Sequence, residues 1–257
     1  MTVFASLRFL YRRYWVLCWF GLAMLLAFWL LRRGKTDDKD WQYVAPFGIQ
    51  LPMRYDLHGI DVSHHNRKIN WERVKEAEAG GVRLQFAFIK ATEGATLVDR
   101  HFTRNWTAAR EAGLRRGAYH FYHPTRDPIR QADNFIRRVA LEAGDFAPVL
   151  DFEVTNGQPD ANIIRDLGIW LDAIESHYGV KPIIYTNTHL YDRFIRAHFD
   201  GYPLWIADYS DPRLDRYDAD KLYLWQHNQR GGVAGVKGHV DFNVFVRDPG
   251  DLNEICL

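Results

Sequence analysis

The stretch PVLDFEVTNGQPDANIIRDLGIWLDAIESHYGVKPIIYT, residues 148–186, contains one complete strand–helix–strand unit. It opens with the apolar, β-rich run 148–153, and from Asp160 apolar side chains recur at helical spacing as far as Gly179. A second β-rich run, 182–186, follows directly. Two strands joined by a helix of this length are typical of neighbouring parallel strands, so the stretch predicts an α/β fold.

The alternation of strand and helix extends to both sides of this unit. Five β-rich runs begin roughly 27 to 34 residues apart, and helical patterns fill the intervals. These runs are 58–62, 85–91, 117–122, 148–153 and 182–186. Capping residues mark two of the helix starts: Asn70 precedes a helix that should end at Gly80-Gly81, and Asp127 precedes a proline at the first helical position.

The rhythm changes after one further predicted helix, 190–198. Three β-rich runs, 203–207, 222–226 and 240–245, follow at shorter spacing, without a helical pattern between the last two. Five strand–helix units followed by three plain strands give eight strands, which is enough to close a barrel. An open, doubly wound sheet is the alternative architecture, although no glycine-rich phosphate loop follows the first strand.

An uncharged segment near the amino terminus predicts a membrane anchor. Residues 14–31, YWVLCWFGLAMLLAFWLL, contain no charged side chain, and as a helix they would span about 27 Å, close to the thickness of a bilayer core. Basic residues flank both ends of the segment, and tryptophans lie towards each end. A cleaved signal peptide fits poorly, because the small-x-small triplet 21–23 lies inside the apolar run, and a buried soluble helix is the other alternative.

The anchor defines four expected parts of the chain. Residues 1–13 are expected in the cytoplasm, 14–31 in the membrane, 32–56 as a charged and proline-interrupted linker, and 57–257 as the globular domain. The basic residues flanking the segment are balanced, so charge favours a cytoplasmic amino terminus only weakly.

Composition places the chain among folded proteins and narrows the function classes. Of the 257 residues 47% are hydrophobic, and 33 basic and 32 acidic side chains give a net charge of +1, which argues against a general nucleic-acid binder. The small net charge is the sum of a basic and an acidic part of the chain. Residues 1–40 hold seven basic and three acidic groups, so the other 217 residues hold 26 basic and 29 acidic groups, a net charge of −3. The two cysteines, Cys18 and Cys256, lie too far apart in sequence to indicate a disulfide framework.

Acidic side chains gather at the predicted strand ends, where parallel barrels place their chemistry. Asp151 and Glu153 have Phe152 between them, so on a strand both carboxylates point to the same side. Asp61 and Asp241 end or begin other strands and can converge with them. Crowding and burial would keep one acid protonated near neutral pH beside ionised neighbours, which is the arrangement that glycoside cleavage requires.

Other polar residues give weaker indications. His120 and His123 would face opposite sides of a strand, so with Asp61 they make a poor metal site, and no metal or other cofactor is predicted. Ser63 lacks the Gly-x-Ser-x-Gly elbow of a serine nucleophile. Lys90 is either a charge partner for a carboxylate in the barrel mouth or a structural ion-pair partner.

Short motifs occur at these strand ends in a fixed order. They are Gly59-Ile60-Asp61-Val62-Ser63, Asn66 with Ile69 and Trp71, Lys90-Ala91-Thr92-Glu93-Gly94, Tyr119-His120-Phe121, Asp151-Phe152-Glu153, Trp205-Ile206-Ala207-x-Tyr209, Trp225-Gln226 and Val240-Asp241-x-Asn243. In order and spacing the chain, over about 57–257, resembles glycoside hydrolase family 25, the lysozymes of the Chalaropsis type. The resemblance implies a flattened TIM-like barrel of five βα units and three further strands, which hydrolyses the β-1,4 bond between N-acetylmuramic acid and N-acetylglucosamine in peptidoglycan.

The resemblance also assigns roles to residues. It implies that Glu153 is the general acid, that Asp151 orients the substrate's acetamido group, and that Asp61 and Asp241 complete an acidic floor. The weaker candidates for contacts with sugar are Tyr122, Tyr185, Trp205, Tyr209 and Gln226. One departure is Arg67, which stands where the family often has glycine and leaves the conformation of the first loop open.

The sequence thus predicts a lysozyme held in the bacterial plasma or inner membrane by a single helix, with its catalytic domain on the periplasmic or wall-facing side. Its expected partners are peptidoglycan glycan strands and, through the anchor, the membrane. A non-catalytic protein that uses the same barrel to bind or scaffold glycan is the main alternative. A metal-dependent polysaccharide deacetylase is a second alternative. The sequence leaves the oligomeric state and the anomeric outcome open.

Overall fold

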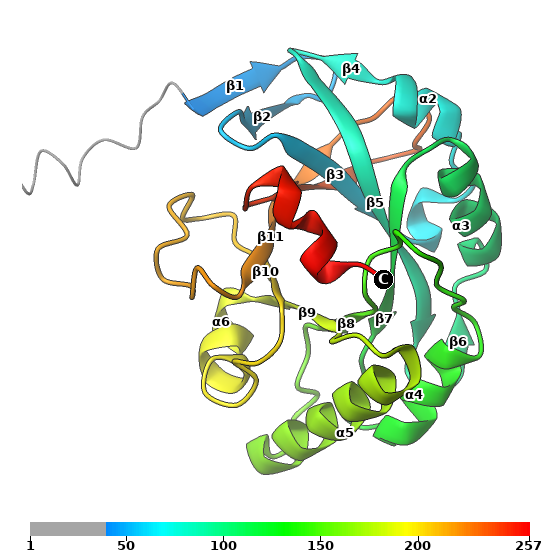
Figure 1. Cartoon of the computed structure of the whole chain (residues 1–257), viewed down its shortest axis with the longest axis vertical. Coiled ribbons are helices and arrows are strands. Elements are labelled where there is room, and N and C mark those ends of the chain that lie inside the picture. Colours follow the sequence, from blue (N-terminus) through cyan, green and yellow to red (C-terminus); the bar gives the residue numbers. More distant parts are fainter. Residues whose placement is uncertain (1–39) are drawn as a thin grey trace, which may run out of the picture. The chain divides into compact units, whose positions relative to one another are not determined.

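The structure, a computed structural model, describes residues 40–257 (Figure 1). The predicted cytoplasmic segment 1–13, the anchor 14–31 and the first part of the linker lie outside the described residues. Between residues 40 and 257 no helix has both the length and the apolar character needed to cross a bilayer. Gln42–Leu257 form one compact unit.

Eight strands form the central barrel of this unit. They are β3 (Leu57–Val62), β5 (Val82–Glu93), β7 (Arg115–Phe121), β8 (Val149–Phe152), β9 (Ile183–Asn187), β10 (Leu204–Ala207), β11 (Leu222–Gly231) and β12 (Val240–Phe245). Each pairs with its neighbours in the order β3-β12-β11-β10-β9-β8-β7-β5, and β5 pairs with β3 to close the ring. All neighbouring pairs are parallel except those made by β12, which runs antiparallel to both β11 and β3. The predicted barrel is confirmed, and the open sheet is excluded.

Helices follow the first five barrel strands, as the sequence predicts. They are α2 (Trp71–Glu76), α3 (Phe102–Glu111), α4 (Pro128–Ile136), α5 (Asp160–Tyr178) and α6 (Thr188–Leu190), which continues as a π-helical turn, η3 (Tyr191–Ile195). The predicted caps are confirmed: Asn70 and Asp127 each accept a hydrogen bond from the backbone of the first helical turn, and α5 ends at Gly179 in the left-handed conformation. No helix follows β10 or β11.

Two predicted helix bounds need correction. The first helix ends at Glu76 rather than at Gly80-Gly81, because the chain there turns into the short strand β4 (Glu78–Ala79), which pairs with the start of β5. The predicted helix 190–198 is shorter and less regular, since regular α-helix covers only Thr188–Leu190 before the π-helical turn.

The folded part begins before the predicted boundary at Leu57. Within the expected linker 32–56, strands β1 (Trp41–Val44) and β2 (Ile49–Pro52) pair with each other, and Leu51 is fully buried. The ring of Phe47 packs 5.3 Å from that of Phe242 on β12, and the carbonyl of Phe47 accepts a hydrogen bond from Gly232. This hairpin therefore packs against β12 and the end of β11, and burial of its apolar side chains corrects the linker assignment from about residue 41 onward.

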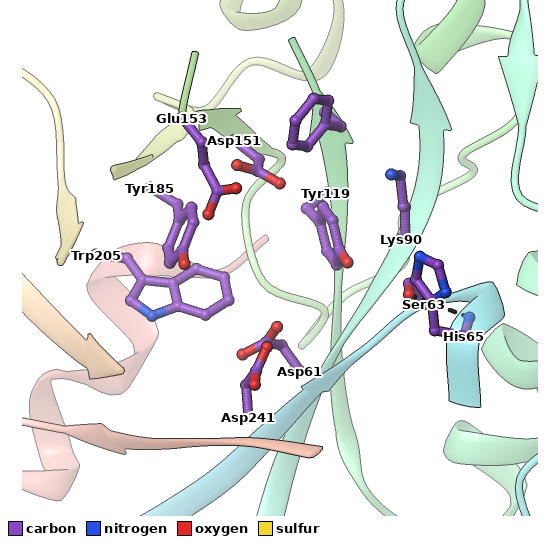
Figure 2. Close-up of a pocket in the computed structure, with 11 residues that line it drawn as sticks. Asp61, Ser63, His65, Lys90, Tyr119, Asp151, Glu153, Tyr185, Trp205 and Asp241 are labelled. Carbon is purple, nitrogen blue, oxygen red and sulfur yellow. Dashed lines mark hydrogen bonds between the residues drawn. The ribbon is translucent and has the colours of Figure 1, made fainter. Parts of the chain in front are cut away.

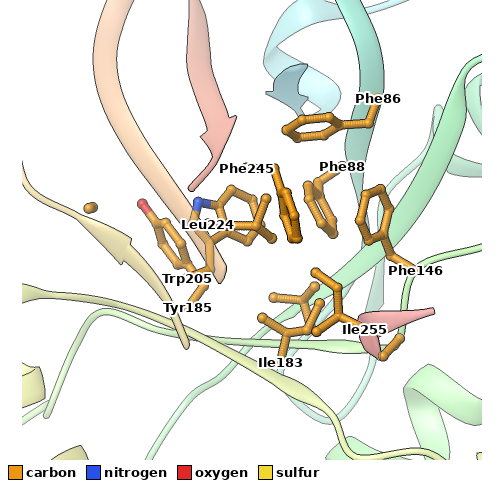
Figure 3. Packing of buried hydrophobic residues seen from close by; sticks show 12 residues of the cluster. Phe86, Phe88, Phe146, Ile183, Tyr185, Trp205, Leu224, Phe245 and Ile255 are labelled. Carbon is orange, nitrogen blue, oxygen red and sulfur yellow. The ribbon is translucent and has the colours of Figure 1, made fainter. Parts of the chain in front are cut away.

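Aromatic rings fill the interior of the barrel below the mouth (Figure 3). The ring of Phe88 lies 4.7 Å from that of Phe146 and 4.4 Å from that of Trp205. A side chain at Gly117 would place its Cβ only 2.3 Å from the Phe88 ring, so glycine is required where this ring crosses β7. Residues after β12 form the 3₁₀ helix η4 (Pro249–Ile255), drawn in red in Figure 1, and its last residue, Ile255, joins the same core.

The loop after β3 adopts a conformation that is unusual for its residue types. Ser63 caps the 3₁₀ turn η2 (His64–Asn66), and the side-chain oxygen of Asn66 accepts a hydrogen bond from the Ser63 backbone N–H. Arg67 follows with φ of 61° and ψ of −139°, a region that favours glycine. The structure thus resolves the conformation that the sequence left open: an arginine occupies a position suited to glycine.

Candidate active site

A pocket opens among the carboxyl ends of the parallel strands (Figure 2). Four acidic side chains line it, together with aromatic and other polar residues. The acids are Asp61, Asp151, Glu153 and Asp241; the aromatic residues are Tyr119, Phe121, Tyr185 and Trp205; the other polar residues are Ser63, His65 and Lys90. All four acids that the sequence singled out thus line one pocket.

The first acidic pair comes from the end of β8. Asp151 and the residue directly after the strand, Glu153, both line the pocket, whereas Phe152 between them is fully buried and packs 5.6 Å from the ring of Phe194. This alternation is the one expected from strand geometry. Glu153 is exposed at the mouth, and Asp151 is buried beside it.

The second acidic pair is made by two neighbouring strands. Asp61 on β3 lies directly opposite Asp241 on β12 in the antiparallel register. Two amide side chains, those of Gln226 and Asn243, each donate a 2.8 Å hydrogen bond to the same carboxylate oxygen of Asp61. Figure 2 shows this pair on the opposite side of the pocket from Asp151 and Glu153.

Burial and nearby negative charge raise the pKa of both carboxyl groups in the cross-strand pair. Burial raises the pKa of Asp61 well above its usual value, and the charge of Asp241 raises it further, although the two amide donors oppose the shift. Burial raises the pKa of Asp241 to about 6, while a hydrogen bond from Asp61 lowers it. The two carboxyl groups therefore titrate as a coupled pair, and both hold a proton more strongly than a free aspartate does.

The pKa of each carboxyl group in the β8 pair is also raised. Burial raises the pKa of Asp151 most strongly, followed by the charge of Glu153, and one of its carboxyl oxygens is buried without a hydrogen-bond partner in the described structure. Desolvation raises the pKa of Glu153, while the nearby hydroxyl group of Tyr185 and the charge of Lys90 lower it. A carboxyl group with a raised pKa, such as that of Glu153, is suited to act as an acid near neutral pH.

Lys90 supplies the positive charge of the pocket. Its ammonium group donates a 2.7 Å hydrogen bond to Glu93 and lies 4.7 Å from the centre of the Phe121 ring. The other oxygen of Glu93 lies 3.1 Å from Nε2 of His123. Of the two roles left open for Lys90, the structure shows both: an ion pair with Glu93 and a charge that lowers the pKa of Asp151 and Glu153.

Gln226 connects the acidic floor to the aromatic wall. Its carbonyl oxygen accepts hydrogen bonds from the hydroxyl groups of Tyr185, at 2.9 Å, and Tyr209, while its amide nitrogen donates to Asp61. Gln226 is buried, so it holds its neighbours in place rather than offering an open surface. Tyr209 is half exposed beside the pocket, which leaves its ring available to a ligand.

Trp205 and Tyr122 differ from the expectation of open sugar-binding platforms. Trp205 lines the pocket but is only 2% exposed, and its indole nitrogen donates a 2.9 Å hydrogen bond to Asn243, so it forms the wall between pocket and core. Tyr122 does not reach the pocket: it is fully buried after β7, two residues beyond His120 and on the same side. The prediction of a sugar contact by Tyr122 is corrected by this alternation of faces.

The same alternation explains which residues the sequence argument missed. Tyr119 and Phe121 face the pocket, whereas His120 packs outward, where its ring stacks 5.6 Å from that of Trp170. The side chains of Thr92 and Gln131 contact the two ring nitrogens of His120, and burial lowers its pKa to about 3. If one residue of β7 had been known to face the pocket, strict alternation of side chains along the strand would have identified Tyr119 as a second pocket residue. Within residues 40–257 no group of three or more His, Cys, Asp or Glu side chains is arranged so that it could hold a metal ion.

Comparisons with known proteins agree with this geometry. The model of glycosyl hydrolases family 25 matches residues 60–236. The chain is 44% identical over 202 residues to the uncharacterized protein YegX of Escherichia coli (strain K12), covering 79% of this chain and 74% of that protein. It is 32% identical over 208 residues to lysozyme M1 of Streptomyces globisporus, covering 74% of this chain and 67% of that protein.

Solved structures show the same relationship. A family 25 glycosyl hydrolase from Bacillus anthracis superimposes with a TM-score of 0.70 and 30% identity, over 79% of this chain and 95% of that one. A bacterial lysozyme from Streptomyces coelicolor gives 0.67 and 28%, over 77% and 96%. The matched family model spans most of the barrel, including three of the four pocket acids. The chain belongs to glycosyl hydrolase family 25 and is a hydrolase of the lysozyme, or muramidase, type.

Proposed function

We propose that this protein hydrolyses the β-1,4 bond between N-acetylmuramic acid and N-acetylglucosamine in peptidoglycan while an amino-terminal helix holds it at the membrane. The observation that supports the activity is the meeting of four acids in one pocket, each with a raised pKa. Glycoside cleavage needs both a protonated carboxylic acid and a nearby negative charge, and this pocket supplies both.

Glu153 is the general acid in this proposal. It stands at the open mouth, where a glycosidic oxygen can reach it, and its raised pKa keeps a proton available. Transfer of this proton to the leaving oxygen accompanies breakage of the bond between that oxygen and the anomeric carbon. The nearby hydroxyl group of Tyr185 and the charge of Lys90 favour the carboxylate that remains.

Asp151 positions the substrate's acetamido group. Its carboxyl group lines the pocket and can accept the acetamido N–H there, which turns the acetamido oxygen towards the anomeric carbon. As the leaving group departs, that oxygen forms the new bond to carbon and closes a five-membered ring. Water then opens the ring, and ionised Glu153 accepts the proton of that water.

Asp61 and Asp241 supply the fixed negative charge. With a pKa of about 6, Asp241 is ionised above that pH and presents a negative charge towards the pocket. A negative charge in a desolvated pocket stabilises the positive charge that develops on the sugar ring during bond breakage. The amides of Gln226 and Asn243 fix the carboxyl group of Asp61 in place beside Asp241.

The location is proposed from the sequence of residues 1–39. The uncharged segment 14–31, flanked by basic residues, supports a single membrane-spanning helix with residues 1–13 in the cytoplasm. The barrel would then lie on the periplasmic or wall-facing side of the plasma or inner membrane, where peptidoglycan is found. Fractionation tests this: the full-length chain should sediment with membranes, and deletion of residues 1–39 should release it.

The decisive test of activity is Glu153→Gln, which preserves size and removes the acid. Incubation of the full-length variant with purified peptidoglycan should release no soluble fragments with new muramic-acid reducing ends. Glu111→Gln provides the matched control, because Glu111 is exposed on α3 and makes no side-chain hydrogen bond or ion pair within residues 40–257. Undiminished turnover by Glu153→Gln would refute the assignment of the acid.

The same experiment distinguishes the alternative of a non-catalytic glycan-binding protein on the same barrel. A binding protein would retain peptidoglycan in a sedimentation assay, and the wild-type chain would release no new reducing ends. The proposed hydrolase releases them, and only Glu153→Gln, not Glu111→Gln, abolishes the release.

A further inference from the structure

A concentration of positive charge lies beside the mouth of this otherwise acidic domain. Residues 41–257 have 26 basic and 29 acidic side chains, yet the segments 63–75 and 228–239 hold six basic residues and one acid, Glu72. Five of those cations are exposed, and we refer to them as the basic rim: Arg67, Lys68, Arg73, Arg230 and Lys237.

Hydrogen bonds hold the two segments of the basic rim together at the edge of the pocket. The first segment begins with the pocket residues Ser63 and His65, and the second ends two residues before Asp241. The side chain of Asn66 donates a 2.9 Å hydrogen bond to the carbonyl of His239, and the backbone of Asn70 donates another, also 2.9 Å, to that of Gly235. The basic rim is therefore continuous with the side of the pocket that contains Asp61 and Asp241.

The cations of the basic rim have no partner of their own. Within residues 40–257 none of their side chains makes a hydrogen bond or an ion pair, whereas the arginines near η3 pair with aspartates, for example Arg196 and Arg216 with Asp192. Arg67 occupies this place although its backbone conformation favours glycine. A charged side chain kept at a strained, exposed position next to a binding pocket points to a ligand.

We propose that the basic rim binds the acidic peptides attached to the glycan strand whose sugars occupy the pocket. This inference rests on the proposed function, because it assumes that the strand is peptidoglycan. The peptides on muramic acid carry free carboxylates, and those next to the cleaved sugar must leave the pocket at its edge. Exposed arginine and lysine side chains at that edge provide the complementary charge. The proposed substrate is therefore a strand with its peptides still attached.

The test compares two soluble substrates: glycan strands with their peptides, and the same strands after an amidase has removed the peptides. The rim variant combines Arg67→Gln, Lys68→Gln and Lys237→Gln in the full-length chain. The control variant combines Arg130→Gln, Arg137→Gln and Arg138→Gln, which removes the same amount of positive charge. These three arginines are exposed, lie in α4 or directly after it, and have no side-chain partner in residues 40–257. The release of reducing ends gives kcat/KM for each protein on each substrate.

We expect the kcat/KM of the rim variant on peptide-bearing strands to fall about five-fold or more. This loss corresponds to the summed free energies of three exposed charge contacts. On stripped strands it should stay within about two-fold of the wild type. The control variant should match the wild type on both substrates, and added salt should reduce the difference on peptide-bearing strands. Equal losses on both substrates, no loss on either, or an equal loss in the control would overturn the proposal.

Two further measurements distinguish a failure of this proposal from a failure of the proposed function, and binding of peptides from binding of an anionic lipid surface. If the wild-type chain cleaves neither substrate, the proposed function fails, and binding of the two strands by wild-type and rim variants still tests the basic rim directly. Vesicles of phosphatidylglycerol test the competing ligand, an anionic lipid surface. Weaker vesicle binding by the rim variant, combined with unchanged kcat/KM on peptide-bearing strands, would overturn the assignment to peptides.

Discussion

Replacement of Asp241 by asparagine should make the protein more stable above pH 6 and less active. Asp241 faces Asp61 across the β3–β12 pair, and burial with neighbouring negative charge disfavours its ionised form. Asparagine has the same shape and carries no charge, and its carbonyl can still accept the hydrogen bond from Asp61. The substitution therefore removes an electrostatic cost that the folded protein bears for the sake of its chemistry.

The size of the effect follows from the pKa. A rise from 3.8 to about 6 corresponds to about 3 kcal/mol at roughly 1.4 kcal/mol per pKa unit, and this is an upper limit because Asp61 titrates with it. Between these two pH values the folded state binds more protons than the unfolded state, so wild-type stability falls as pH rises. The variant lacks this loss, and its advantage should grow from near zero at pH 4 to about 2–3 kcal/mol at pH 8.

Denaturant titrations at several pH values between 4 and 8 measure this difference. Asp133→Asn is the control, because Asp133 is exposed on α4 and its side chain makes no hydrogen bond or ion pair in the described structure. It should shift stability by less than about 0.5 kcal/mol at every pH. A stability gain for Asp241→Asn that is the same at pH 4 and pH 8, or a loss at pH 8, would refute the electrostatic reasoning.

Three other substitutions test features of the fold. Arg67→Gly should raise the free energy of unfolding by about 1 kcal/mol by relieving the positive φ, and an unchanged thermal midpoint would contradict the strain. Gly117→Ala should lower it by about 1–3 kcal/mol or more, since the new methyl group meets the Phe88 ring; a stability equal to wild type in denaturant would show that the ring can move. Phe47→Ala should lower the free energy of unfolding by about 3 kcal/mol, because its contact with Phe242 is lost. An unchanged free energy of unfolding in the same assay would show that the hairpin behaves as a linker and not as part of the folded domain.

Periodicity was sufficient to predict the barrel because its units are regular. The α5 pattern from Asp160 to Gly179 and the two β-rich runs around it each match one element of the structure. The hairpin β1–β2 was missed because its strands are only four residues long and a proline ends the second, so the apolar positions have no period to detect. Their burial depends on contacts with Phe242 and Gly232, distant in sequence.

The site residues could be predicted where alternation along one strand determines which way a side chain points. They could not be predicted where their positions depend on how distant parts of the chain pack together. Asp151 and Glu153 share a face by geometry alone, and the structure confirms it. Tyr122 was a wrong prediction because an aromatic residue at a strand end can face either way, and here it is fully buried on the same outer side of the barrel as His120. The role of Gln226 as a support for three neighbours depends on distances between β3, β9 and the loop after β10, which no sequence pattern contains.

The closure of the ring also sets an order of events during synthesis. β3, the first barrel strand to be made, has β12, the last, as one of its two neighbours, and Ile255 near the carboxyl terminus completes the core beneath them. The cross-strand pair Asp61 and Asp241 therefore meets only after almost the entire chain has left the ribosome. Until then the enzyme has no assembled acidic floor, so a nascent chain or one truncated at its carboxyl end would be inactive.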